Sequence, residues 1–371
     1  MSQIHNNVHM INEIKQQTEL FRHILARRKQ YTKEFVELFQ TKQVQEIIFI
    51  GSGSPSHVSQ TLKYAAISVL NVRATAPLPS LFVHHEGKSI IDHSCPGKTI
   101  LICPVESGRT KGPVFAAQMA KAANIPIVCT TLDEHSSLAK LADVVIKKPS
   151  GEEIAPPSTK GHSTGLLLLL LCFLDAARAT GRLQPVQLDA YEQAIADLPD
   201  RVANTTQYVQ SWFSEHRDDV VKAPNYWFLA YGSNVGTATE AVLKFIESHQ
   251  KPTFAYELEE FLHGPLCAVK KNDIVFFLAT EEGPEKQRML ELYDAMKPDY
   301  PYCTLVHPQG DTGRDTWDLP IDAGNMPFFD ALDYLIPVQV LSYEIADALG
   351  IDVTVWTTTA IRQKLKPGFE R

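Results

Sequence analysis

No Lys/Arg-rich run stands out in the sequence, and no pair of cysteines has CxxC spacing. Without a basic run we expect no nucleic-acid partner, and the net charge of −8 (35 basic, 43 acidic residues) is typical of soluble enzymes. No HExxH motif is present either, so no metal site is expected. Four of the six cysteines lie in apolar runs, which predicts buried thiols in a reducing compartment: Cys103, Cys129, Cys172 and Cys303.

Long apolar segments are also missing. The N-terminus lacks the apolar core of a signal peptide, and the most apolar stretch, 166–174, ends at Asp175 after nine residues. Because a bilayer span needs about 20 residues, we interpret this stretch as a buried helix. A cytoplasmic protein without a membrane partner is therefore predicted. The 371 residues, 44% hydrophobic and 21% charged, exclude disorder and suffice for two or three domains.

The chain contains an internal repeat. Apolar runs at 45–50 and 226–230 each end in a Gly/Ser turn, and matching Gly53 to Gly232 gives an offset of 179 residues. Matching Gly108 to Gly283, which follow the next apolar runs, gives an offset of 175 residues. Three further pairs of segments match in order: 125–131 with 302–307, 143–146 with 318–321, and the apolar helices 166–177 with 336–346.

Within each half, short apolar runs rich in β-formers alternate with helical patterns, which is typical of βαβ units. The prediction is an α/β fold with two tandem, doubly wound, flavodoxin-like parallel-sheet domains. We expect an N-terminal helical segment at 1–40, a first domain at 41–182, a helical linker at 183–222, and a second domain with a C-terminal tail at 223–371.

Two polar turns of the first half each follow a predicted strand and precede a predicted helix. In open parallel sheets ligands bind at the carboxyl ends of strands, where helix N-termini offer N–H groups to anions. For either segment alone, helix caps and turns are the better explanation. Neither segment is a Walker loop. The first segment is not a GxGxxG motif either, because Ser56 stands where the third glycine would be. The candidate substrate-binding residues are Ser52, Gly53, Ser54, Glu106, Ser107, Gly108 and Thr110, with Ser158 from a third polar cluster at 156–164.

The second half gathers polar groups of another kind. Glu240, Lys244 and Glu247 have i, i+4 and i+7 spacing and share one face of a predicted helix, which also suits an exposed salt-bridged stripe. His263 stands before Gly264-Pro265 in a loop, a plausible place for proton transfer, although loop histidines are often merely exposed.

Taken together, these residues resemble the double sugar-isomerase (SIS) domain proteins. The resemblance rests on the repeat, on the turns GSGS, ESGRT and PPSTKG, and above all on Glu247 followed sixteen residues later by His263-Gly264-Pro265. It covers about residues 40–360. The nearest relatives in pattern are the isomerase half of glucosamine-6-phosphate synthase, the fructosamine-6-phosphate deglycases and the amino-sugar deaminase/isomerases.

The resemblance implies roles for individual residues. Glu247 matches the base that moves a proton between C1 and C2 of the open-chain sugar, and Lys244 matches a catalytic-site lysine near the sugar. His263 matches the histidine that assists ring opening, which the synthase contributes across a dimer interface. The implied phosphate ligands are Ser54, Ser107 and Thr110, and Ser158 lines the sugar site. No metal or organic cofactor is implied. The partners implied are a phosphorylated sugar (amine) and a second copy of the chain, as a homodimer or larger assembly with active sites at the interface.

The chain also departs from the synthase pattern. Ser52 and Pro55 stand where the synthase has a cysteine and a serine, and Val105-Glu106 replaces Ser-Gln. A carboxylate beside a phosphate is unfavourable unless Arg109 or Lys111 compensates. Ile361 falls opposite the tail lysine of the synthase, with Lys364 and Lys366 nearby.

The expected function follows from these matches. No glutaminase domain is recognised in the sequence, and Gly53-Ser54-Pro55 is like the deglycases, so we expect an isomerase or deglycase of a 6-phosphorylated sugar amine. One alternative is an amino-sugar-phosphate deaminase or aldose–ketose isomerase. Another is a non-catalytic sugar-phosphate sensor.

Overall fold

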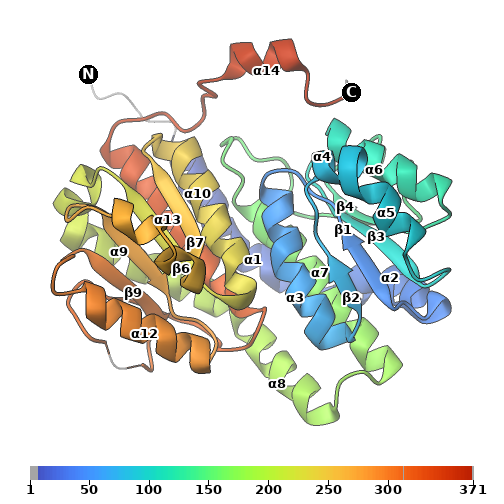
Figure 1. Ribbon diagram of the computed structural model, residues 1–371, viewed down its shortest axis with the longest axis horizontal. Coiled ribbons are helices and arrows are strands. Elements are labelled where there is room, and N and C mark those ends of the chain that lie inside the picture. Colours follow the sequence, from blue (N-terminus) through green and yellow to red (C-terminus); the bar gives the residue numbers. More distant parts are fainter. Residues whose placement is uncertain (1–6, 312, 370–371) are drawn as a thin grey trace. The chain divides into compact units, whose positions relative to one another are not determined.

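A computed structural model describes residues 7–311 and 313–369. The described chain divides into two compact units, each built around one parallel sheet (Figure 1). What we call the first unit comprises Leu20–Glu152, Lys160–Ala190 and 356–369. The second unit comprises 7–19, Glu153–Thr159 and Tyr191–Val355.

The first unit contains five parallel strands in the order β2-β1-β3-β4-β5. They are β1 (Glu46–Phe49), β2 (Arg73–Thr75), β3 (Thr99–Pro104), β4 (Ile127–Thr131) and β5 (Val144–Lys147). Apart from β2, they are the apolar runs that the sequence predicts as strands. The helices are α2 (Arg28–Lys42), α3 (Ser54–Leu70), α4 (Pro79–Leu81), the π-helix η1 (Phe82–Glu86), α5 (Gly87–Asp92), α6 (Lys111–Ala122), α7 (Lys160–Thr180) and α14 (Thr359–Leu365).

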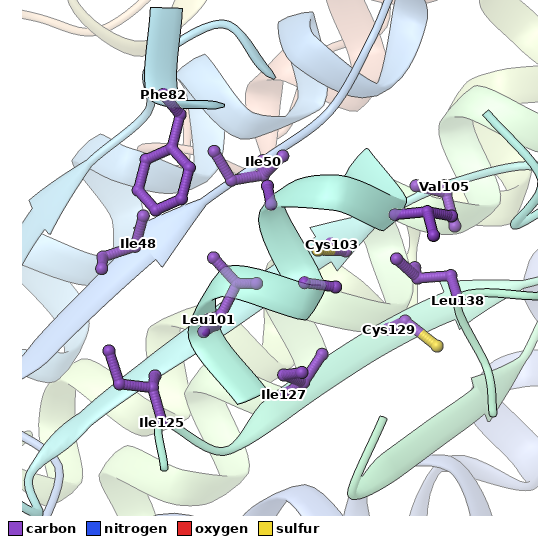
Figure 2. Packing of buried hydrophobic residues seen from close by; sticks show 14 of the residues in the cluster. Ile48, Ile50, Phe82, Leu101, Cys103, Val105, Ile125, Ile127, Cys129 and Leu138 are labelled. Atoms are coloured by element: carbon purple, nitrogen blue, oxygen red, sulfur yellow. The ribbon is translucent and has the colours of Figure 1, made fainter. Parts of the chain in front are cut away.

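Successive side chains of a strand point to opposite faces of the sheet, and both faces of the first sheet are buried. Ile48, Leu101 and Ile127 pack with Phe82 and with small residues of α6 (Figure 2). On the other face α2, α3 and α7 pack against one another, and the ring of Phe173 on α7 lies 6.1 Å from that of Phe49.

The second unit repeats this architecture. Its order, β10-β9-β8-β6-β7, is that of the first sheet when β6 is matched to β1, β7 to β2 and so on. The strands are β6 (Tyr226–Ala230), β7 (Thr253–Glu257), β8 (Ile274–Leu278), β9 (Cys303–Pro308) and β10 (Leu319–Ile321). The helices are α9 (Leu198–Lys222), the 3₁₀ turn η2 (Gly232–Asn234), α10 (Val235–His249), α11 (Leu258–Leu262), the 3₁₀ turn η3 (Pro265–Ala268), α12 (Pro284–Met296) and α13 (Asp330–Ala348).

This shared 2-1-3-4-5 order is the flavodoxin-like one, so the predicted fold class and the repeat are confirmed. In such a sheet the order reverses between the first and third strands, and the crevice at that point is where ligands bind. In the first unit the turns at 50–53 and 105–110 follow β1 and β3, so both lie at this switch point.

Helices also occupy the N-terminal segment and the segment between the two sheets. Residues 1–40 include α1 (Val8–Ala26), and the linker contains α8 (Pro185–Ala196) and α9. The compact units, however, are discontinuous, whereas the division drawn from sequence is contiguous. The loop at 153–159 belongs to the second unit because Glu13 accepts a hydrogen bond from the Ile154 amide at 2.6 Å and Gln339 donates to the Thr159 carbonyl at 3.1 Å.

Helix α7 carries the apolar stretch that the sequence interprets as a buried helix. By length and composition alone it could cross a membrane, but every residue from Lys160 to Leu174 is buried. Cys103, Cys129, Cys172 and Cys303 are also buried and unbridged, as predicted. Burial raises the pKa of the Cys129 and Cys303 thiols to about 12, so these are inert core residues.

His249, the last residue of α10, should make the stability of the protein depend on pH. Burial, with the nearby Lys251 ammonium, lowers the pKa of His249 to about 3. The folded imidazole therefore stays neutral where the unfolded one, with a pKa near 6.5, binds a proton, so stability falls as pH drops below 6.5. We expect His249→Asn to remove about 2 kcal/mol of the stability lost between pH 6.5 and 5.

The measurement for His249 is urea denaturation of both proteins across that pH range. Asparagine keeps an acceptor for the Lys251 amide, which lies 3.3 Å from the His249 Nδ1 atom. Buried carboxyls elsewhere contribute equally to both proteins and cancel in the difference. Parallel stability curves for the two proteins would contradict the assignment.

Candidate active site

The first polar turn of the first unit is shaped by its glycines. At Gly51 a Cβ atom would lie 2.3 Å from the Pro55 carbonyl oxygen, so only glycine lets the turn close on the first residues of α3. Ser52 is half-buried and Gly53 is exposed, while Ser54 is buried as the first residue of the helix. The turn thus presents the N-terminus of a 17-residue helix, whose first amides have no partner within the helix.

The second polar turn is held by its backbone. The Glu106 carbonyl accepts from the Leu132 amide at 2.9 Å and from the Thr131 hydroxyl at 3.1 Å. Gly108 has a φ of 65°, and a Cβ there would lie 2.1 Å from the Ser136 hydroxyl, so glycine is required. Ser107 is exposed, and Thr110 precedes the first residue of α6.

The first turn lies close to α6, the helix that follows the second turn. A Cβ on Gly112, in the first turn of α6, would lie 3.8 Å from the Ser52 hydroxyl oxygen. A cavity of about 430 Å³ opens there, lined by Ser52, Gly53 and Gly112 together with residues of α4 and η1. The first turn therefore faces the helix that follows the second turn, and hydroxyls and helix N-termini of both lie in one unit.

Charge in the second turn is compensated differently from the sequence-based expectation, which named Arg109 or Lys111. Arg109 forms an ion pair with Asp133, and the Lys111 ammonium lies 5.9 Å from the ring centroid of Phe369. Glu106 instead pairs with Lys148, which follows β5. Sequence reasoning missed Lys148 because 41 residues separate the two and nothing local marks them as neighbours.

The C-terminal tail reaches this turn. Thr110 and Gly368 form an antiparallel bridge, and the Phe369 amide donates to the Arg109 carbonyl at 2.9 Å. Ile361, opposite the tail lysine of the synthase pattern, is exposed on α14, as is Lys364.

In the second unit α10 carries the predicted acidic face, and it is buried. The Lys244 ammonium lies 2.6 Å from a Glu247 carboxylate oxygen and 3.5 Å from one of Glu240. The side chains of Lys244 and Glu240 are each 1% exposed, whereas that of Glu247 is 16% exposed. This excludes the alternative of an exposed stripe, and leaves Glu247 as the member of the group that solvent and a ligand can reach.

Burial and charge oppose each other at Lys244. Burial lowers the pKa of the ammonium, but the carboxylates of Glu247 and Glu240, and then that of Glu153, outweigh it and raise the pKa overall. The lysine therefore stays charged and holds the Glu247 side chain in place.

The Ser158 loop lies in the same unit as this group, positioned by Glu153, a residue that the sequence analysis missed. One Glu153 oxygen accepts from the Ser158 hydroxyl at 2.7 Å, and the other accepts from the Thr159 amide at 2.6 Å and hydroxyl at 2.7 Å. Its charge also acts on Lys244. The structure thus brings Ser158, Lys244 and Glu247 into one electrostatic neighbourhood.

His263 directly follows α11 and is exposed, and its imidazole makes no hydrogen bond within 7–311 and 313–369. Gly264 has a φ of 143°, a conformation that glycine tolerates and other residues rarely adopt, and Pro265 begins η3. The His-Gly-Pro sequence therefore encodes a defined turn that presents the imidazole to solvent.

Comparison with known proteins adds the family. A model of the SIS domain matches residues 41–174, which includes both polar turns of the first unit. Residues 41–174 form a SIS domain. The matched segment contains β1, β3 and α6.

Longer similarities extend across the chain. The glutamine–fructose-6-phosphate aminotransferase [isomerizing] of Clostridium tetani is 23% identical over 367 residues, covering 93% of this chain and 57% of that protein. The chain thus spans about half the length of the curated relatives it matches. The two solved structures described next are 23% and 18% identical to this chain, so they show a shared fold and no more.

Both structures are similar over nearly the whole chain. The C-terminal domain of glucosamine-fructose-6-phosphate aminotransferase from Francisella tularensis has a TM-score of 0.82 and 23% identity, covering 93% of this chain and 97% of that one. Tagatose-6-phosphate ketose/aldose isomerase from Escherichia coli has a TM-score of 0.75 and 18% identity, covering 93% and 94%.

Proposed function

We propose that the chain is a phosphosugar isomerase or deglycase acting on a 6-phosphorylated sugar amine of the fructosamine 6-phosphate type. The observation that carries the proposal is Glu247, a partly exposed carboxylate held at 2.6 Å by a fully buried ammonium. Interconverting a C1 and a C2 carbonyl requires a fixed carboxylate that removes a proton beside the carbonyl and returns it one carbon away. The SIS domain at 41–174 and the aminotransferase relatives support a phosphosugar as the substrate class.

The proposed chemistry balances without a redox step. Glu247 takes a proton from C1 of the open-chain ketosamine, which gives an enaminol, and the proton returns to C2. The product is an imine at C1, which water hydrolyses to an aldose 6-phosphate and the free amine. The reaction needs no metal or organic cofactor, and Lys244 orients the base throughout.

The phosphate, in this proposal, binds the two turns of the first SIS domain. Ser54, Ser107 and Thr110 supply hydroxyls or amides, and α3 and α6 direct their N-termini at the anion. Binding energy from this remote group serves the reacting carbons. The second unit, which has the same strand order, is proposed as a second SIS domain.

We assign the ring-opening step to His263, which in this proposal acts in the active site of a partner copy within a homodimer or larger assembly. An exposed imidazole on a rigid turn suits such a role. A cytoplasmic location and the absence of nucleic-acid and membrane partners remain predictions of the sequence.

His263→Ala is expected to lower turnover of cyclic substrates about 10²-fold or more and that of substrates locked open much less, because only ring opening needs this acid/base. Steady-state kinetics on both kinds of substrate measures the difference. Equal losses would argue that His263 does not open the ring.

The function is tested with a panel of 6-phosphorylated sugar amines, assayed for glucose 6-phosphate, fructose 6-phosphate, ammonia and free amino acid. Release of amino acid with glucose 6-phosphate supports the deglycase. Ammonia supports a deaminase, and sugar isomerisation alone supports the aldose–ketose isomerase, the activity in the name of the Escherichia coli structure. Silence across the panel, with thermal stabilisation by the ligands, would overturn the enzyme in favour of a sensor.

A further inference from the structure

We propose that Lys148 sets the affinity of the first SIS domain for phosphate by neutralising Glu106, the carboxylate that stands in the phosphate-binding turn. The inference rests on the proposed function, since it assumes that this turn binds the phosphate of the substrate. It assigns a positioning role to a residue that the proposed chemistry does not use.

Glu106 cannot leave the turn. Its carbonyl is fixed by the Leu132 amide and the Thr131 hydroxyl, and the preceding Val105 amide donates to the Thr130 carbonyl at 3.1 Å. Gly108, two residues on, is packed against Ser136 and its carbonyl accepts from the Leu138 amide at 3.0 Å. The backbone of Glu106 is therefore fixed within the turn, and 33% of its side chain is exposed.

Lys148 is the buried partner of Glu106. Its side chain is 2% exposed, and its backbone amide is fixed to the Thr131 carbonyl at 2.8 Å. Besides Glu106, the ammonium contacts the Gly161 carbonyl at 3.3 Å, at the start of α7. A Cβ on Gly165 would lie 3.8 Å from the lysine Cδ atom, so α7 closes the space around the stem. A buried ammonium requires a partner of this kind, and its position is set by the fold.

The other cations beside the turn are engaged elsewhere. The Arg109 guanidinium pairs with Asp133, and the Lys111 ammonium lies over the ring of Phe369 in the tail. The two ion pairs, Glu106–Lys148 and Arg109–Asp133, leave the side chains of the turn with no net charge. Amides and hydroxyls can then bind a dianion without working against a carboxylate.

Removing the lysine alone should let the Glu106 carboxylate oppose the binding of phosphate. We expect Lys148→Met to weaken binding of glucose 6-phosphate and of inorganic phosphate about 100-fold, because an uncompensated carboxylate repels a phosphate dianion a few ångströms away. Glu106→Gln should bind at least as tightly as the native chain. The double variant, which again lacks net charge in the turn, should recover affinity to within about threefold of Glu106→Gln.

Lys147→Met is the matched control. Lys147 is adjacent in sequence and pairs with Glu134 at 2.7 Å, but its side chain is 62% exposed and it lies at the end of β5. It should bind both ligands as the native chain does. Titration calorimetry on the full chain measures the affinities, and KM against kcat on the active substrate should show the loss in KM.

The outcomes separate this inference from the proposed function. If the native chain binds neither glucose 6-phosphate nor phosphate, the proposed function fails and this inference with it. If the native chain binds and Lys148→Met binds equally well, the inference alone is overturned. A folded double variant as weak as Lys148→Met also overturns it, because the lysine would then contact phosphate directly. If Lys148→Met does not fold, the comparison of the double variant with Glu106→Gln makes the same decision.

Discussion

Glu247→Gln is expected to reduce turnover by about 10²–10⁴-fold while leaving phosphosugar binding within a few-fold of native. Glutamine preserves the shape of the side chain and can still contact Lys244, but it cannot accept the proton from the substrate carbon. Because the substitution leaves Ser54, Ser107 and Thr110 unchanged, the proposed anchor of the substrate phosphate is untouched. Steady-state kinetics and titration with glucose 6-phosphate measure the two quantities separately.

Glu240→Gln provides the control for that experiment. It makes the same chemical change on the same helix, seven residues away, and its side chain also contacts Lys244. With 1% exposure it cannot meet a substrate, so its turnover should fall far less. Normal turnover by Glu247→Gln, or equal losses in both variants, would remove Glu247 from the role of base.

Elements with strong local patterns were predictable from the sequence. The eight apolar strands and the repeat that relates them follow from burial on both faces of a parallel sheet. The edge strands β2 and β7 were not predicted. Arg73–Thr75 is three residues long and mostly exposed, so it carries no apolar run, and Thr253–Glu257 is only partly buried. Such strands form because a neighbouring strand offers hydrogen bonds, which a local pattern does not record.

The candidate site divides in the same way. The helical spacing of Glu240, Lys244 and Glu247 predicts their shared face, and the structure adds that this face is buried. Glu153 and Lys148 escaped sequence reasoning because their partners are set by tertiary structure. Lys148 follows β5 and contacts Glu106, which follows β3. The charge of Glu153 acts on Lys244, 91 residues later in the chain.

Lys244→Met is expected to destabilise the second unit by about 3–5 kcal/mol, because it removes the buried ammonium that pairs with the buried carboxylate of Glu240. Methionine matches the lysine stem in length, so the packing around it is largely kept and the effect reports the missing charge. The loss should be greatest at neutral pH. Burial disfavours the charged form of a carboxyl group that has lost its ammonium, so the variant should regain stability as the pH is lowered towards 5.

The double variant Lys244→Met/Glu240→Gln decides whether that destabilisation is electrostatic. Removing both buried charges replaces an ion pair by neutral groups of similar volume, a change that is often close to neutral for stability. We therefore expect the double variant to recover most of the lost stability, and to lose the pH dependence of the single variant. Because the chain has two compact units, calorimetry that resolves their transitions is the appropriate measurement. A double variant as unstable as Lys244→Met would show instead that packing of the lysine stem, and not the paired charges, holds the α10 face in place.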